Sequence, residues 1–234
     1  MVSVLPQVTK LGGMALNLLF PKWCLGCGKE GDFICPSCSN TMPRVMPPLC
    51  PHCGRPQASS ILCPRCVGRA AEIDGIRAPF RFDGVVRQAV YKLKYDNLRA
   101  IAPFLGQMLY DYINENRVPG DVLIPVPLHH KRLRGRGYNQ AALLAGKLSE
   151  LTGLPLITDL LIRQRDTHPQ ALTKTASDRQ SNVANAFYSR ELRDREVLLI
   201  DDVATSGATL NACAAALKAA GATSVWGLVL AREI

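Results

Sequence analysis

The sequence has no hydrophobic run that approaches the roughly 20 apolar residues needed to span a bilayer. Its most apolar early stretch, residues 14–20, is short and includes Asn17. No small-residue cleavage site follows, because Pro21, Lys22 and Trp23 lead directly into the first cysteine, so we expect no secretory signal. These absences predict a protein that is not integral to a membrane and that is located in the cytoplasm.

Long blocks of like charge and low-complexity tracts are also absent, which argues against a disordered charged tail. The charge is nevertheless unbalanced, because 28 basic residues against 19 acidic ones give a formal net charge of +9. This excess favours a polyanionic partner, either a nucleic acid or a phosphorylated metabolite. With 234 residues, of which 47% are hydrophobic, the chain can bury one substantial core and still carry a small extra module.

Eight of the nine cysteines lie within the first 66 residues and form four CxxC pairs. Two thiolates on one tight turn can bind the same ion, and two such turns complete the tetrahedral site that Zn²⁺ prefers. Nothing suggests export, which argues against disulfides, and a redox CxxC would not need four copies. We therefore predict one or two structural zinc ions, bound by Cys24, Cys27, Cys35, Cys38, Cys50, Cys53, Cys63 and Cys66.

The four pairs allow two arrangements. Neighbouring pairs can share a metal, first with second and third with fourth, or the pairs can interleave, first with third and second with fourth. In either arrangement the metal would supply most of the stability, because this region of about 50 residues has few apolar side chains. We assign residues 1–72 to the zinc-ribbon module and residues 73–234 to a second domain.

The second domain alternates strand-like and helix-like segments, which is typical of an α/β fold with a parallel sheet. We expect strands at residues 76–82, from Val122 onward, 197–200 and 225–230, and helices at 83–95, 101–113, 139–151 and 208–220. The apolar spacing of residues 83–95 leaves Lys92 and Lys94 free. Together with the next helix, this segment is expected to cover a pocket as a hood.

The segment of residues 197–209 points to a ligand. An apolar strand runs into Asp201 and Asp202, and a hydroxyl-rich turn with Gly207 then opens a helix. Free N–H groups at a helix N-terminus favour a phosphate, and glycine permits close approach. Two carboxylates suit ribose hydroxyls, directly or through Mg²⁺. The sequence thus predicts a sugar-phosphate pocket, and the alternative is a turn whose hydroxyls merely cap the helix.

All thirteen positions of this segment resemble the phosphoribosyl pyrophosphate (PRPP) motif of type I phosphoribosyltransferases. The resemblance implies a type I phosphoribosyltransferase-like parallel sheet flanked by helices, with Mg²⁺ accompanying PRPP. It also implies that the two acids hold the ribose hydroxyls and that the following turn holds the 5′-phosphate. The PRPP-binding residues expected on this basis are Asp201, Asp202, Ala204, Thr205, Ser206, Gly207, Ala208 and Thr209.

A second phosphate element is expected in a loop after the strand that begins at Val122. Four basic residues fall within six positions there, and the planar fork of arginine can clasp phosphate oxygens. A solvated basic loop or a nucleic-acid patch would have the same composition. The residues predicted to bind pyrophosphate are Lys131, Arg132, Arg134 and Arg136.

A narrower resemblance rests on Val126-Pro-Leu-His and on Arg-Gly-Arg-Gly-Tyr-Asn-Gln-Ala at residues 134–141, together with the cysteine-rich head and the PRPP motif. From Cys24 to Ile234 the chain resembles the ComF/GntX family, bacterial phosphoribosyltransferase-like proteins associated with competence and the use of external DNA. The resemblance implies a flexible loop that covers bound PRPP. Its expected residues are Thr167, Gln170, Arg179 and Asn182.

Two functions stay open at this point. One is a DNA-uptake accessory that binds PRPP, contacts single-stranded DNA and works with proteins of the uptake machinery. Its candidate DNA surface consists of Tyr91, Lys92, Lys94, Tyr95 and Tyr138. The other is an active phosphoribosyltransferase with an unidentified base or amine acceptor, whose general base the sequence does not reveal.

Overall fold

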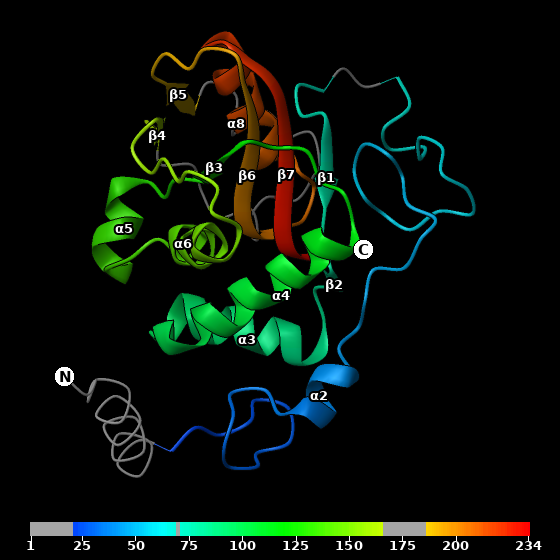
Figure 1. Ribbon diagram of the computed structural model, residues 1–234, viewed down its shortest axis with the longest axis vertical. Coiled ribbons are helices and arrows are strands. Elements are labelled where there is room, and N and C mark those ends of the chain that lie inside the picture. Colours follow the sequence, from blue (N-terminus) through cyan, green and yellow to red (C-terminus); the bar gives the residue numbers. More distant parts are fainter. Residues whose placement is uncertain (1–20, 69–70, 166–185) are drawn as a thin grey trace, which may run out of the picture.

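A parallel sheet lies at the centre of the structure, a computed structural model that describes residues 21–68, 71–165 and 186–234 (Figure 1). The strands lie in the order β1, β7, β6, β3, and a short β2 also pairs with β7. All of these pairings are parallel, which confirms the predicted fold class. The strands are β1 (Gly75–Arg77), β2 (Phe80–Arg81), β3 (Val122–Pro125), β6 (Arg195–Ala204) and β7 (Ala222–Arg232).

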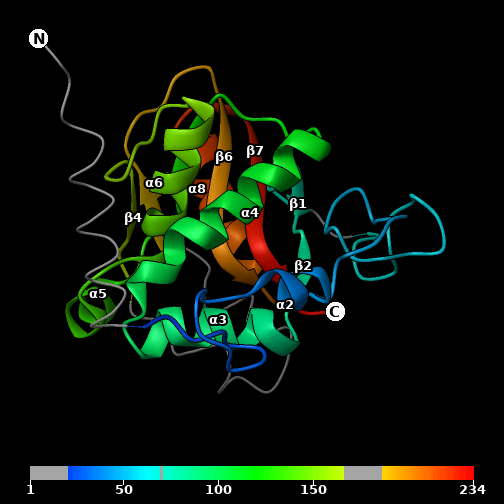
Figure 2. The same ribbon diagram turned by 60° about the horizontal axis from the view of Figure 1, so that its bottom comes forward.

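Helices cover one face of the sheet, and a helix with a small hairpin covers the other (Figure 2). The first face carries α3 (Gly84–Tyr95), α4 (Ala102–Glu115) and α6 (Gln140–Thr152). The second carries α8 (Ala208–Ala219) and the antiparallel strands β4 (Leu161–Arg163) and β5 (Phe187–Ser189). Among the described residues, none of the helices is long and apolar enough to cross a membrane.

The apolar pattern of β6 explains why both faces are covered. Leu198 and Ile200 pack into the core under α3, α4 and α6, whereas Val197 and Leu199 pack into the core under α8. Successive strand residues point to opposite faces, so a continuous apolar run must be buried on both sides. This is the arrangement that the sequence of the strand predicts.

Several predicted elements differ from those in the structure. The strand expected at 76–82 is divided into β1 and β2, and β6 continues to Ala204, because its pairing with β7 extends to Arg232. Asp201 and Asp202 therefore lie inside the strand. The predicted basic loop is instead a short helix, α5 (His130–Arg136), which ends at Gly137 with a left-handed φ of 78°.

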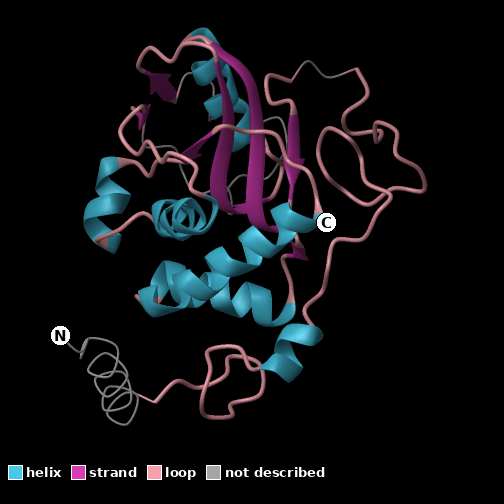
Figure 3. Ribbon diagram, viewed as in Figure 1, coloured by secondary structure: helices cyan, strands magenta, loops and turns pink. Residues whose placement is uncertain are grey.

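The cysteine-rich region lies on two different sides of the sheet and consists almost entirely of loops (Figure 3). The first ribbon, residues 21–42, contains the short helix α2 (Pro36–Asn40), and its Ile34 and Met42 share a core with α3 and α4. The second ribbon, residues 49–67, lies beside β1, where the Ile76 N–H donates to the His52 carbonyl at 2.8 Å. Each ribbon thus packs on the sheet domain, and the division near residue 72 stays a prediction.

Candidate functional site

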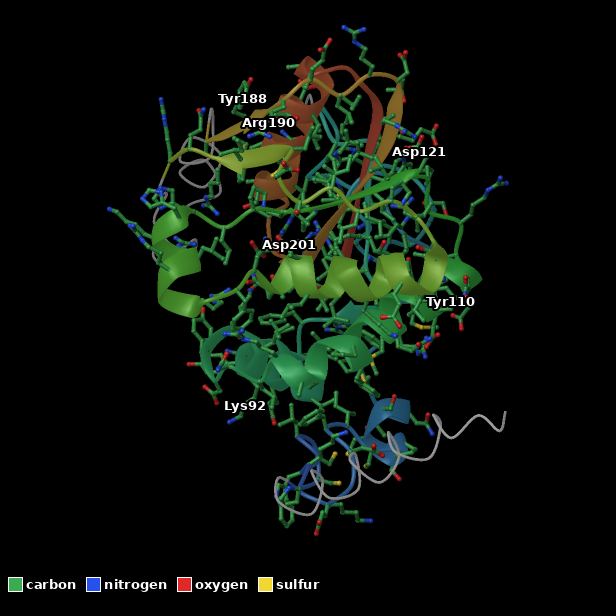
Figure 4. The ribbon with its side chains drawn as sticks, turned by 60° about the vertical axis from the view of Figure 1, so that its left-hand side comes forward. Lys92, Tyr110, Asp121, Tyr188, Arg190 and Asp201 are labelled. Atoms are coloured by element: carbon green, nitrogen blue, oxygen red, sulfur yellow. The ribbon has the colours of Figure 1, made fainter. Side chains whose placement is uncertain are left out.

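The acidic pair lies near the carboxyl end of β6. Asp202 is only 2% exposed, and its Oδ2 pairs with the Lys94 Nζ of α3 at 2.5 Å. Asp201 is partly exposed, and its Oδ1 accepts the Asp202 N–H at 2.9 Å. Figure 4 shows Asp201 in the middle of the molecule and Lys92 on the outer side of α3. The expectation that both lysines are free was wrong, since Lys92 also pairs, with Asp96 at 2.6 Å.

The pKa values of the two carboxyl groups are shifted in opposite directions. Burial and the charge of Asp202 raise the pKa of Asp201 well above its ordinary value of 3.8. Burial alone would also raise the pKa of Asp202, but the Lys94 ammonium holds that pKa below its ordinary value. Asp202 is therefore the carboxylate that anchors Lys94, whereas burial disfavours the charged form of Asp201.

The turn between β6 and α8 has the backbone of an anion-binding loop. We call residues 205–209 the phosphate loop. Gly207 has a left-handed φ of 83°, and a Cβ there would lie 3.0 Å from Ile76 Cδ1, so a larger residue would be strained. The Ser206 Oγ accepts the Ala208 N–H at 3.3 Å, whereas the N-cap position is Gly207, which has no side chain to cap the helix. Part of the hydroxyl cluster therefore serves the turn, and the PRPP-binding residues stay a prediction.

The basic helix α5 brings one arginine toward the acidic pair. Arg136 helps to lower the pKa of Asp202, and its guanidinium lies 5.6 Å from the centroid of the Tyr95 ring. Lys131 and Arg134, by contrast, are exposed, and Arg132 is partly buried. Pyrophosphate binding by this helix stays a prediction. The expected flexible-loop residues Thr167, Gln170, Arg179 and Asn182 lie outside the described residues.

Two functional contacts were missed by sequence reasoning. Lys94 follows the buried Leu93, and nothing in its own helix marks it as the partner of an aspartate 108 positions later. Arg55 donates from Nη2 to the Thr205 carbonyl of the phosphate loop at 3.0 Å, a contact across 150 positions. Both contacts depend on tertiary packing, which leaves no local pattern in a single sequence.

The candidate DNA surface is also smaller than expected. Tyr138 is buried, and its hydroxyl donates to the Leu93 carbonyl. Lys94 is held by Asp202, so neither residue is available at the surface. Tyr91 and Tyr95 are 57% and 64% exposed, and their ring centroids lie 4.6 Å apart.

The cysteines form two separate clusters, one in each ribbon. Within each cluster the sulfur atoms lie within 4.8 Å of one another. The Cys27–Cys35 and Cys53–Cys63 sulfur distances are both 3.7 Å, close to the separation of about 3.8 Å that tetrahedral Zn–S bonds of about 2.3 Å require. Neighbouring pairs thus share a site, and the interleaved arrangement is wrong. The two sets are Cys24, Cys27, Cys35 and Cys38, and Cys50, Cys53, Cys63 and Cys66.

Backbone hydrogen bonds favour the thiolate form of one cysteine in each cluster. The Cys35 N–H donates to Cys24 Sγ at 3.3 Å, and the Cys63 N–H donates to Cys50 Sγ at 3.4 Å. Burial alone would raise these thiol pKa values, but backbone N–H groups lower the pKa of Cys24 and of Cys50 to about 6. Because Zn²⁺ binds the thiolate form, both clusters fit a structural zinc ion, which would cross-link the ribbon.

Comparison with known proteins agrees with this architecture. A double zinc ribbon domain model matches residues 15–67, and a phosphoribosyl transferase domain model matches residues 136–233. Competence protein F of Haemophilus influenzae is 31% identical over 211 residues, which cover 85% of this chain and 90% of that protein. The chain belongs to the ComF/GntX family.

Two further relatives of this ComF/GntX chain have similar coverage. Competence protein ComFC of Bacillus subtilis is 29% identical over 219 residues, covering 88% of this chain and 86% of the relative. The DNA utilization protein YhgH of Shigella flexneri is 30% identical over 208 residues, covering 86% and 91%. The combination of a zinc ribbon with a phosphoribosyltransferase-like domain is thereby confirmed for this ComF/GntX protein.

The first prediction concerns the buried ion pair. Lys94→Met removes the partner of Asp202 and leaves a carboxylate buried, so we expect the free energy of unfolding at pH 7 to fall by about 3 kcal/mol. Urea denaturation measures this change. Lys92→Met is the control, because its exposed pair with Asp96 contributes only about 0.5 kcal/mol. Equal effects of the two substitutions would contradict the role of Lys94.

The second prediction concerns zinc content. Elemental analysis of the purified chain should find two zinc ions per molecule. The double variant Cys27→Ser with Cys38→Ser should retain one zinc, because both residues belong to the same cluster. A variant that loses both ions while remaining folded would contradict the assigned pairing.

Proposed function

We propose that this ComF/GntX protein binds PRPP with Mg²⁺ and acts in the cytoplasm in the uptake or utilisation of external DNA. The observation that carries the proposal is the position of Asp201 and Asp202 on the strand that enters the phosphate loop. Carboxylates for the ribose and the N–H groups at the start of α8 for its 5′-phosphate then lie on consecutive stretches of chain. The printed names of the three relatives support the role in DNA uptake or utilisation.

The electrostatics of the pocket support Mg²⁺ as the companion of PRPP. Asp201 is the carboxyl with the raised pKa, so it must lose its proton before it can bind a cation strongly. Arg136, on the neighbouring helix α5, lies within electrostatic range of Asp202, and its guanidinium suits the negative charge of the ligand. Lys94 already neutralises Asp202, which leaves Asp201 as the residue for the metal.

The third prediction follows from this difference. Binding of PRPP with Mg²⁺ should release a proton from Asp201, so affinity should increase as the pH rises through the raised pKa of that carboxyl. Calorimetry in two buffers of different ionisation enthalpy measures both the affinity and the released proton. Asp201→Asn should lower the affinity at least tenfold and remove the pH dependence, while circular dichroism shows an intact fold. Asp96→Asn, an exposed carboxyl on the other side of α3, should change neither.

The DNA contact is assigned to the exposed tyrosines of α3. Tyr91 and Tyr95 present neighbouring rings, and the Arg136 guanidinium lies over Tyr95, 5.6 Å from its centroid. Lys92 is on the same exposed helix surface. Bases of a single strand stack on aromatic rings while cations bind the phosphates, which gives binding without sequence preference. The surface therefore suits single-stranded DNA next to the PRPP pocket.

The fourth prediction tests this surface by fluorescence anisotropy with a labelled oligothymidylate. Tyr91→Ala with Tyr95→Ala should weaken binding by at least about 30-fold, since each of two stacked bases contributes roughly 1–3 kcal/mol. Tyr188→Ala is the matched control, because Tyr188 is 51% exposed on β5 and lies far from Lys92 and α3 (Figure 4). Binding by the unaltered protein should also weaken steeply with salt. Equal losses in both variants, or no salt dependence, would rule out the assigned surface.

A further inference from the structure

Arg232, the last residue of β7, is a buried cation. Its side chain is only 1% exposed, and its buried Nε and Nη1 have no hydrogen-bond partner in the described part of the chain. Arg232 lines one cavity together with Cys53 and Cys66 of the second cluster and with Ser206 of the phosphate loop. A guanidinium removed from water requires a compensating negative charge. Among the described residues, the cluster beside Cys53 is the group placed to provide it.

The second cluster has the right charge for this role. Zn²⁺ with four thiolates carries a net charge of −2. Cys50, Cys53 and Cys63 are all buried, so water screens this charge weakly. The end of β7 around Arg232 therefore acquires its counter-charge when zinc is bound.

A second arginine connects the same ribbon to the phosphate loop. Arg55 follows Cys53 by two residues, and its carbonyl accepts the Cys50 N–H at 2.8 Å, which ties it to the metal-binding turn. Its Nη2 donates to the Thr205 carbonyl at 3.0 Å. The position of Thr205, the first residue of the phosphate loop, is thus linked to the backbone of the cluster.

Ile76 on β1 makes a third connection. Its N–H donates to the His52 carbonyl at 2.8 Å, and a Cβ at Gly54 would lie only 2.2 Å from its carbonyl oxygen, so ribbon and strand are in close contact. On its other side, Ile76 Cδ1 lies 3.0 Å from the Cβ position of Gly207. The second ribbon therefore contacts β1, and Ile76 of β1 in turn contacts the phosphate loop.

The first ribbon has different neighbours. A Cβ at Gly26 would lie 3.5 Å from Val85 Cγ2 of α3, and Leu25, Phe33 and Ile34 belong to the core shared with α3 and α4. The two ribbons thus contact different elements, the first α3 and α4, and the second β1 and the phosphate loop. This difference supplies a matched internal control.

We propose that zinc in the second cluster sets the conformation of the phosphate loop, and hence its affinity for a phosphate ester, with Arg55 and Arg232 as the positioning residues. The consequence for affinity rests on the proposed function, whereas the consequence for loop conformation does not. Loss of this zinc would remove the counter-charge of Arg232 and release Arg55 from Thr205. Zinc occupancy of the second cluster would thereby change the affinity for the ligand.

The test compares Cys66→Ser in the second cluster with Cys38→Ser in the first, since both residues are partly buried. Hydrogen exchange of amides 203–211, zinc content and the affinity for PRPP with Mg²⁺ are measured for each variant. Cys66→Ser should raise exchange in the phosphate loop at least tenfold and lower the affinity at least tenfold. Cys38→Ser should leave the exchange of this segment unchanged. Equal exchange in both variants would overturn the proposal.

A second set of variants keeps both zinc sites, in case Cys66→Ser does not fold. Arg55→Met should lower the affinity for PRPP at least fivefold and raise exchange at Thr205 with two zinc ions still bound. Arg65→Met is the matched control, because Arg65 is an exposed arginine of the same ribbon near Ser206. Equal losses of PRPP affinity in both variants would show that the effect comes from the arginine charge alone, and would overturn the proposal. If the unaltered protein does not bind PRPP, the proposed function fails. Hydrogen exchange of amides 203–211 then tests by itself whether zinc sets the conformation of the phosphate loop.

Discussion

The long parallel pairing of β6 with β7 places the acidic pair, the phosphate loop and Arg232 at one end of the sheet. The register joins Asp201 to Val229 and Ala204 to Arg232, so the strand that carries the carboxylates is held along its whole length. Both strands are buried on two faces, which ties their positions to two cores at once. Displacing either strand would expose apolar side chains on both sides, and the site is rigid for that reason.

Charge compensation is the second constraint on this site. The chain has an excess of cations, yet two of them lie beside specific groups: Lys94 pairs with Asp202, and Arg232 is buried beside the second cluster. Such pairs contribute little net stability, but breaking one leaves a costly unpaired charge. They therefore hold the hood helix α3 and the second ribbon in one position relative to the sheet.

The zinc ribbons also have a different relation to the fold than their sequence suggests. A cysteine-rich region with few apolar residues indicates a separate small module, and the CxxC spacing correctly identifies its metal ligands. In the structure the two ribbons lie on different sides of the sheet, the first against α3 and the second against β1. A few residues such as Arg55 and Ile76 thus connect the second ribbon to the turn between β6 and α8.

The sequence by itself determined the parallel α/β class, the eight cysteine ligands and the segment that enters the phosphate loop. Each has a local signature: an apolar run at residues 197–200, a CxxC turn, and a glycine after hydroxyls. Strand ends were less predictable, because β6 extends to Ala204 only through its pairing with β7. The partners of Asp202, Thr205 and Arg232 were decided by tertiary structure alone. Burial and charge compensation join residues more than a hundred positions apart, and neither leaves a periodic pattern along the chain.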